Sequence, residues 1–102
     1  MYDINKNVFL MTTGSQFQSE LGVHFRKVAV KSLSKIRNDI LYGGESNKEL
    51  AHKVKGIALS CGAMEVARVC FKLEHYDGVI SKVSGQRILS DVSNVMILLC
   101  DA

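Results

Sequence analysis

His52 is the side chain in this 102-residue chain that is best placed for chemistry. It lies in the stretch 50–63, which reads as a helix of about three to four turns. At about 100° per residue, Leu50, Val54 and Ala58 share one apolar side of that helix, and His52 points almost directly away from it. A neutral imidazole on a solvent-facing surface is a nucleophile that can accept a phosphoryl group. A lone exposed histidine is more often only solvated, so its neighbours decide between these interpretations.

Three lysines surround His52 in this stretch. Lys48 and Lys55 lie about one helical turn before and after it, and Lys53 follows it directly. A phosphoryl group in transfer carries negative charge that a nearby cation stabilises. We therefore expect Lys55 to stabilise that charge, and Lys48 and Lys53 to contact a partner. Taken alone, each of them is an ordinary surface lysine.

Gly56 and Leu59 lie on the same side of the helix as His52. A glycine inside a helix costs about 1 kcal/mol relative to alanine. Its presence on a solvent face indicates a reason, and the reason we expect is steric access of a partner to the His52 ring. Leu59 would be an apolar docking contact, although scattered exposed apolar residues are common.

The residues around His52 follow a longer pattern. The run His52-Lys53-Val54-Lys55-Gly56 is followed, over about 23 residues without a gap, by Gly62-Ala63 and by a helix that ends Cys70-x-x-Leu73-Glu74. This pattern resembles that of histidine-containing phosphotransfer (HPt) domains, and is similar to the C-terminal HPt domains of hybrid sensor histidine kinases. The motif His-x-x-Lys-Gly alone is weak, and the later elements make it specific.

The resemblance implies a function and its partners. His52 would accept a phosphoryl group from a receiver-domain aspartate and pass it to a response-regulator aspartate in two-component signalling. Mg²⁺ would be held by the partner receiver domain, and no cofactor or metal ion is expected on this chain, which offers no acidic cluster near His52. Ile57, Ser60 and Cys61 depart from the small or Asn-Leu residues of the family, a departure that concerns core packing rather than the mechanism.

An autonomous catalytic activity is not expected. The chain has no Gly-rich phosphate-binding loop and no room for a nucleotide-binding domain, so we interpret it as a phosphoryl carrier, either free-standing or part of a hybrid sensor histidine kinase. The alternative is a non-catalytic helical docking module that binds a receiver domain through the Leu59 face without phosphotransfer. A small metal-binding bundle is a third, less favoured interpretation.

The net charge of +3 is distributed unevenly. Between His24 and Ser60, eight Lys/Arg residues stand against three Asp/Glu, which favours an acidic partner unless it is only a solvated helix face. Nucleic acid is not an expected partner, because the net charge is modest and no aromatic residues alternate with the basic ones. No apolar run approaches the roughly 20 residues of a membrane span, and the first residues lack the basic-then-apolar pattern that a signal peptide would have. We expect no direct membrane insertion and a cytoplasmic location, including the cytoplasmic end of a membrane-bound sensor kinase.

The expected fold is all-α: an antiparallel four-helix bundle of up-down topology with a short N-terminal covering helix. Residues 1–102 would form a single domain, for which a monomer is sufficient, with a cover segment at 1–14 and the bundle at 15–102. The absence of proline permits long helices. Helices are predicted at about 16–41, 47–61 and 64–76, and a last one begins near Val79 or after Ser84-Gly85.

Capping residues mark the predicted helix ends. Ser15 can cap the first long helix, which has room for a bend near Gly22. Ser46 followed by Glu49 is a capping box for the His52 helix, and Gly62 suits a left-handed position at its end.

Apolar residues at spacings of three and four predict the buried stripes. The three cysteines stand at apolar helical positions and read as small core residues in a reducing compartment. In the first long helix, the stripe consists of Phe17, Leu21, Phe25, Val28, Ala29, Leu33, Ile36 and Ile40.

Overall fold

The computed structural model describes residues 2–101, and within them it contains helices and no strand. The helices are α1 (Lys6–Thr13), α2 (Glu20–Tyr42), α3 (Asn47–Cys61), α4 (Met64–His75) and α5 (Lys82–Cys100). The all-helical class predicted from the sequence is therefore confirmed, and the predicted bounds of 47–61 for the His52 helix match α3.

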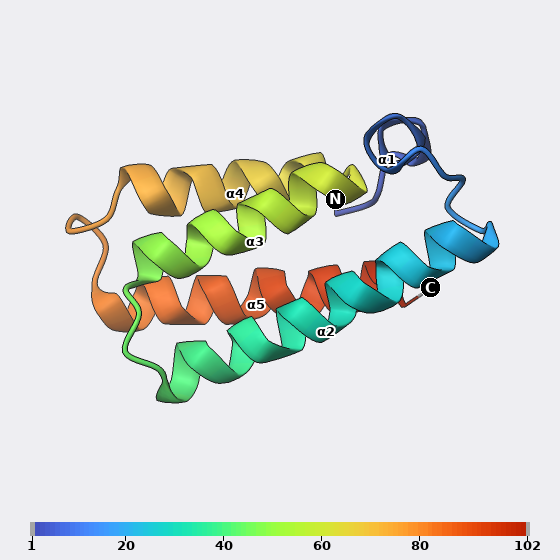
Figure 1. Cartoon of the computed structure of the whole chain (residues 1–102). Helices are drawn as coiled ribbons and strands as arrows, with labels where there is room; N and C mark the ends of the chain where they lie inside the picture. Colours follow the sequence, from blue (N-terminus) through green and yellow to red (C-terminus); the bar gives the residue numbers. More distant parts are fainter. Residues whose placement is uncertain (1, 102) are drawn as a thin grey trace.

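The four longer helices lie side by side along the long dimension of the molecule, and α1 lies across one end (Figure 1). α3 packs most extensively against α4, and α2 against α5, while α3 also contacts α1, α2 and α5. The radius of gyration is 13.2 Å, close to the roughly 13 Å of a compact chain of this length. The core is one continuous cluster of buried apolar side chains to which every helix contributes.

α2 begins later than predicted, at Glu20 rather than near residue 16. Its N-cap is Ser19, whose Oγ accepts a hydrogen bond from the backbone N–H of Gly22 at 3.1 Å. Ser15 is buried before the helix starts and does not cap it, so that prediction is wrong. The preceding chain folds back closely on Gly22, where an added Cβ would lie 1.9 Å from the carbonyl oxygen of Gln16. Only glycine allows this approach.

α5 begins at Lys82, between the two predicted starts. Its N-cap Ser81 accepts a hydrogen bond from the N–H of Ser84 at 3.1 Å. Gly85 is therefore not a helix-start signal but a buried position inside the helix, where an added Cβ would lie 2.6 Å from Nδ2 of Asn47. That amide in turn donates to the carbonyl of Lys82 at 3.0 Å, which joins the start of α3 to the start of α5.

The first half of α2 does not bury the predicted stripe. Leu21, Phe25 and Val28 are 62%, 42% and 49% exposed, which corrects the prediction that they belong to the core. The side that faces the core carries Gly22 and Arg26 instead, together with Ala29, whose predicted burial is confirmed. The physical reason is Arg26, a residue that is 5% exposed and whose guanidinium donates hydrogen bonds to backbone carbonyls that this side of the helix must therefore face.

Arg26 holds together three segments of the chain. Its Nε donates to the carbonyl of Phe17 at 3.1 Å and its Nη1 to the carbonyl of Cys100 at 2.9 Å. Its Nη2 donates to Oε1 of Gln18 at 3.3 Å, and its guanidinium lies 4.1 Å from the centre of the Phe17 ring. Hydrogen bonds and a cation–π contact thereby compensate for removing the charge from water.

The three cysteines are free and buried, as predicted for small core residues. Burial, together with the nearby Glu74 carboxylate, raises the pKa of the Cys70 thiol to about 12. The thiol of Cys70 is therefore protonated and unreactive at neutral pH. Among the helices of residues 2–101, none combines the length and the hydropathy that a membrane crossing requires.

Candidate functional site

α3 is held at both ends by the residues that the sequence singled out. Ser46 Oγ accepts a hydrogen bond from the N–H of Glu49 at 3.2 Å. At the other end Gly62 adopts a left-handed conformation with φ of 82°, and its N–H bonds back to the carbonyls of Ala58 and Leu59. The carbonyl of Gly62 also accepts from the N–H of Asn5 at 2.8 Å, which seats the start of α1 on the turn between α3 and α4.

His52 meets a carboxylate of the neighbouring helix. Its Nδ1 lies 2.6 Å from Oε1 of Glu74 on α4, and Nζ of Lys55 lies 2.5 Å from Oε2 of the same carboxylate. The His52 side chain is 72% exposed, whereas those of Lys55 and Glu74 are 21% and 14% exposed. One carboxylate thus joins the candidate nucleophile and the candidate cation, each through its own oxygen.

Glu74 was not among the residues for which the sequence pattern predicted a chemical role. The expectation of no acidic cluster near His52 concerned a pocket for Mg²⁺, whereas the structure places a single carboxylate, that of Glu74, against the imidazole. Glu74 was visible only as the last residue of the Cys-x-x-Leu-Glu pattern. The signal that could have found it is geometric, because the tight turn at Gly62-Ala63 brings α4 back along α3.

The electrostatics of Glu74 keep it ionised. Burial opposes its ionisation, but the hydrogen bonds from Lys55 and His52 outweigh that effect and hold the pKa of the Glu74 carboxyl below its ordinary value. A carboxylate can only accept, so His52 must donate from Nδ1–H. In the neutral ring this leaves Nε2 with the free lone pair of a nucleophile.

Lys55 is directed toward α4 rather than into solvent. Its ammonium lies 5.5 Å from the centre of the Phe71 ring as well as against Glu74. In the unphosphorylated protein the Glu74 carboxylate balances the charge of Lys55, so Lys55 is not an unpaired cation beside the His52 ring.

The other predicted contact residues surround an open depression beside His52. Lys48 is exposed. Lys53 reaches the Glu45 carboxylate at 2.6 and 2.7 Å, and the hydrogen bond with Glu45 raises the pKa of Lys53. The depression is lined by Glu45, Ser46, Lys48, Glu49, His52, Lys53 and Glu74. Both cations and carboxylates therefore line the depression beside the imidazole, rather than cations alone.

Gly56 and Leu59 complete the predicted set. An added Cβ at Gly56 would meet nothing within 4 Å, so the glycine is not required by packing within this chain. Leu59 is 43% exposed. A groove between α2 and α3 runs past Gly56 and is lined by Ser32, Lys35, Ile36, Asp39, Lys53, Gly56 and Ile57.

Replacing Gly56 by alanine separates stability from access. Because the space is open and the position is helical, Gly56→Ala is expected to raise the free energy of unfolding by about 0.5–1 kcal/mol. Transfer of a phosphoryl group from a receiver domain should become slower, since the new methyl lies one turn after His52. Urea unfolding and a transfer time course measure the two effects. A destabilised variant, or one that is stabilised with unchanged transfer, would contradict our explanation of this glycine.

The pKa of Glu74 predicts how the site responds to acid. Because the folded protein lowers this pKa, ionised Glu74 stabilises the fold at neutral pH, and the contribution is lost as the pH falls through the folded value. The stability advantage of the wild type over Glu74→Gln should therefore shrink in acid below the ordinary glutamate range. Urea unfolding of both proteins at neutral and acid pH measures this, and a constant difference would contradict the assignment.

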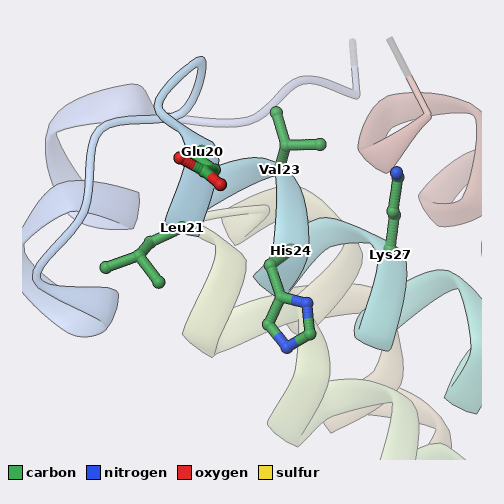
Figure 2. Close-up of a pocket in the computed structure, with 5 residues that line it drawn as sticks. All are labelled: Glu20, Leu21, Val23, His24 and Lys27. Atoms are coloured by element: carbon green, nitrogen blue, oxygen red, sulfur yellow. The ribbon is translucent and has the colours of Figure 1, made fainter.

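A second surface lies at the start of α2, and it includes Leu21, which the sequence pattern assigned to the core. Figure 2 draws the side chains that line a pocket here, all of which come from residues 20–27 of this helix: Glu20, Leu21, Val23, His24 and Lys27. The exposed Leu21, Phe25 and Val28 recur at helical spacing on α2. The sequence pattern did not predict this exposed apolar stripe, because it assigned the same residues to the core.

Metal ligands do not converge in residues 2–101. Glu49 and His52 have the Glu-x-x-His spacing found in metal-binding bundles. The described part of the chain nevertheless contains no group of three or more His, Cys, Asp or Glu side chains that could hold a metal ion.

Comparison of the chain with protein-family models, with curated proteins and with solved structures gave no match. The functional assignment therefore depends on the residues and the geometry around His52.

Proposed function

We propose that this protein is a phosphorelay carrier that accepts a phosphoryl group from a receiver-domain aspartate onto His52 and passes it to a response-regulator aspartate. The observation that carries the proposal is the Nδ1 of His52 fixed 2.6 Å from Glu74 while the imidazole stays 72% exposed. This combination presents Nε2 to a partner in one tautomer. In the same proposal α2–α5 form an antiparallel four-helix bundle of the HPt type, which α1 covers at one end.

The chemistry requires little from the carrier itself. The lone pair of Nε2 attacks the phosphorus of the acyl phosphate, the bond between phosphorus and the aspartate oxygen breaks, and its electron pair returns to the receiver carboxylate. The ring keeps its proton at Nδ1, where Glu74 accepts the hydrogen bond and balances the new positive charge. Mg²⁺ and the acidic pocket belong to the receiver, and in-line positioning with charge neutralisation supplies most of the catalysis.

The proposal implies a cytoplasmic protein that acts as a monomer, either alone or within a hybrid sensor histidine kinase. Its partners are receiver domains, whose acidic phosphorylation pockets complement Lys48, Lys53 and the exposed lysines of α2. No autonomous catalytic activity, nucleic acid partner or bound cofactor is part of the proposal.

Lys55→Ala is expected to slow transfer several-fold while it changes stability by about 1 kcal/mol or less. The ammonium can supply charge to the phosphoryl oxygens, whereas its pair with Glu74 is partly exposed, at 21% and 14%, and contributes only modestly to folding. Transfer rates from a receiver domain and urea unfolding test both parts, with Lys82→Ala as the comparison because Lys82 is an exposed lysine of α5 outside the proposed site. Unchanged transfer in Lys55→Ala would remove this residue from the site.

The exposed apolar stripe favours a second candidate function, a docking module that binds a receiver without phosphotransfer. Leu21, Phe25 and Val28 offer apolar area on α2 that nothing in residues 2–101 covers. The two functions differ in one measurement. A phosphorylated donor receiver is mixed with the protein and a second receiver, and acid-labile, base-stable label is followed through all three. A carrier moves label to the second receiver, whereas a docking module binds both receivers and acquires none.

A further inference from the structure

We propose that Glu74 and the phosphoryl group compete for Lys55, so that this lysine switches partner each time His52 gains or loses the group. The inference rests on the proposed function and goes beyond it, because it gives the carrier two arrangements of charge. It concerns Glu74 as a positioning residue, which acts through Lys55 and His52.

The geometry shows why the two partners exclude each other. Glu74 gives Oε1 to Nδ1 of His52 and Oε2 to Nζ of Lys55, so both oxygens are engaged in the unphosphorylated protein. Lys55 lies one turn from His52 on α3, a spacing at which side chains are neighbours. Its flexible stem can reach the carboxylate or a group on Nε2, but one ammonium cannot hold both at hydrogen-bond distance with full strength.

Phosphorylation changes the charges in a defined way. Before it, the neutral ring, Glu74 and Lys55 sum to zero. Afterwards the phosphoryl group adds up to two negative charges, while the ring, which keeps its Nδ1 proton, becomes cationic and remains the partner of Glu74. Because attraction scales with charge, Lys55 gains more from the phosphoryl group than from a carboxylate already balanced by the ring. Glu74 thus keeps its bond to His52 and releases Lys55.

This exchange limits how strongly Lys55 stabilises the phosphoryl group on His52. Part of the attraction between Lys55 and the phosphoryl group is offset by the loss of the ion pair with Glu74. The phosphorylated state is therefore stabilised less than it would be with a free lysine, which suits a protein that must pass the group on.

Phosphoramidate is the probe, because it can load the protein without any receiver domain. The Nε2 lone pair attacks its phosphorus, the bond from phosphorus to the protonated amino group breaks, and ammonia leaves. A pH titration followed by ³¹P NMR then gives the ionisation constant Ka for loss of the second proton from the phosphoryl group. A nearby cation raises this Ka, and so lowers the corresponding pKa, because it favours the dianion. The proteins compared are the wild type, Glu74→Gln, Lys55→Ala and the double variant. Glutamine retains an oxygen that can accept from Nδ1 but carries no negative charge to compete for Lys55.

The competition predicts that Glu74→Gln raises this ionisation constant by at least about threefold, and that most of the increase disappears in the Lys55→Ala background. Glu65→Gln is the matched control, since it removes from α4 a carboxylate that is paired with Arg68 at 2.6 Å; its ionisation constant should equal that of the wild type.

Two kinds of result would overturn the inference. An ionisation constant unchanged by Glu74→Gln, or raised equally with and without Lys55, would show that the lysine does not switch. A failure of phosphoramidate and receivers alike to load His52 would contradict the proposed function itself, and the inference with it. The first result leaves a loaded protein and the second does not, so the two failures are distinguishable.

Discussion

His52→Gln is expected to abolish phosphoryl acceptance completely while the protein remains folded. The substitution removes the only atom in the proposal that forms a bond to phosphorus. The side chain is 72% exposed and its one hydrogen bond is to Glu74, so the cost in stability should be about 0.5–1.5 kcal/mol. Acid-labile label after incubation with phosphorylated receivers measures acceptance, and helical circular dichroism on heating measures folding.

The two remaining histidines provide matched controls. His24 on α2 and His75 on α4 are both exposed, and neither belongs to the site. His24→Gln and His75→Gln should accept label like the wild type. Label that persists in His52→Gln and disappears in either control would move the site to another histidine.

Gly62→Ala should produce the largest loss of stability, about 2–4 kcal/mol. Its φ of 82° is a left-handed conformation that costs an L-residue about 1–2 kcal/mol. An added Cβ would also lie 2.5 Å from the carbonyl oxygen of Asn5. Relief of that contact requires the start of α1 to move away, which endangers the hydrogen bond from the N–H of Asn5 to the carbonyl of Gly62. For a chain of this size each kcal/mol lowers Tm by about 4–8 °C.

Gly14 isolates the contribution of the backbone. It ends α1 in a similar left-handed conformation, with φ of 73°, but an added Cβ there would meet nothing within 4 Å. Gly14→Ala should therefore cost about 1 kcal/mol or less. Thermal unfolding of both variants tests the difference. Equal losses would mean that the approach of α1 to Gly62 adds nothing to stability.

The sequence predicted best where the determinants are local. The start of α3 follows from Ser46, whose side chain accepts a hydrogen bond from the backbone N–H three residues later. Its end follows from Gly62, whose left-handed conformation is a local property of the backbone. The apolar side of α3 was also correct for Leu50, Val54 and Ala58, which are fully buried. Periodicity suffices there because α3 packs against the other four elements around it.

The errors arose where distant residues decide. Periodicity assigned Leu21, Phe25 and Val28 to the core, but the hydrogen bonds of Arg26 to Phe17 and Cys100 turn another side of α2 inward. The sequence pattern does not indicate that Arg26 would donate hydrogen bonds to the backbone carbonyls of Phe17 and Cys100.

Glu74 illustrates the same limit within the site. It is 22 positions from His52, and its meeting with Nδ1 depends on how α4 returns along α3. The types of residue around His52 indicated phosphoryl chemistry, but the tautomer of the ring and the engagement of Lys55 required the tertiary structure.

The most direct test of the account is to locate the phosphoryl group after incubation of the protein with phosphorylated receiver domains and Mg²⁺. Mass spectrometry under alkaline conditions preserves phosphohistidine and assigns the modified residue. We predict one phosphoryl group, on His52. A protein that binds these receivers but carries no phosphoryl group on His52 would contradict the account and favour the docking module.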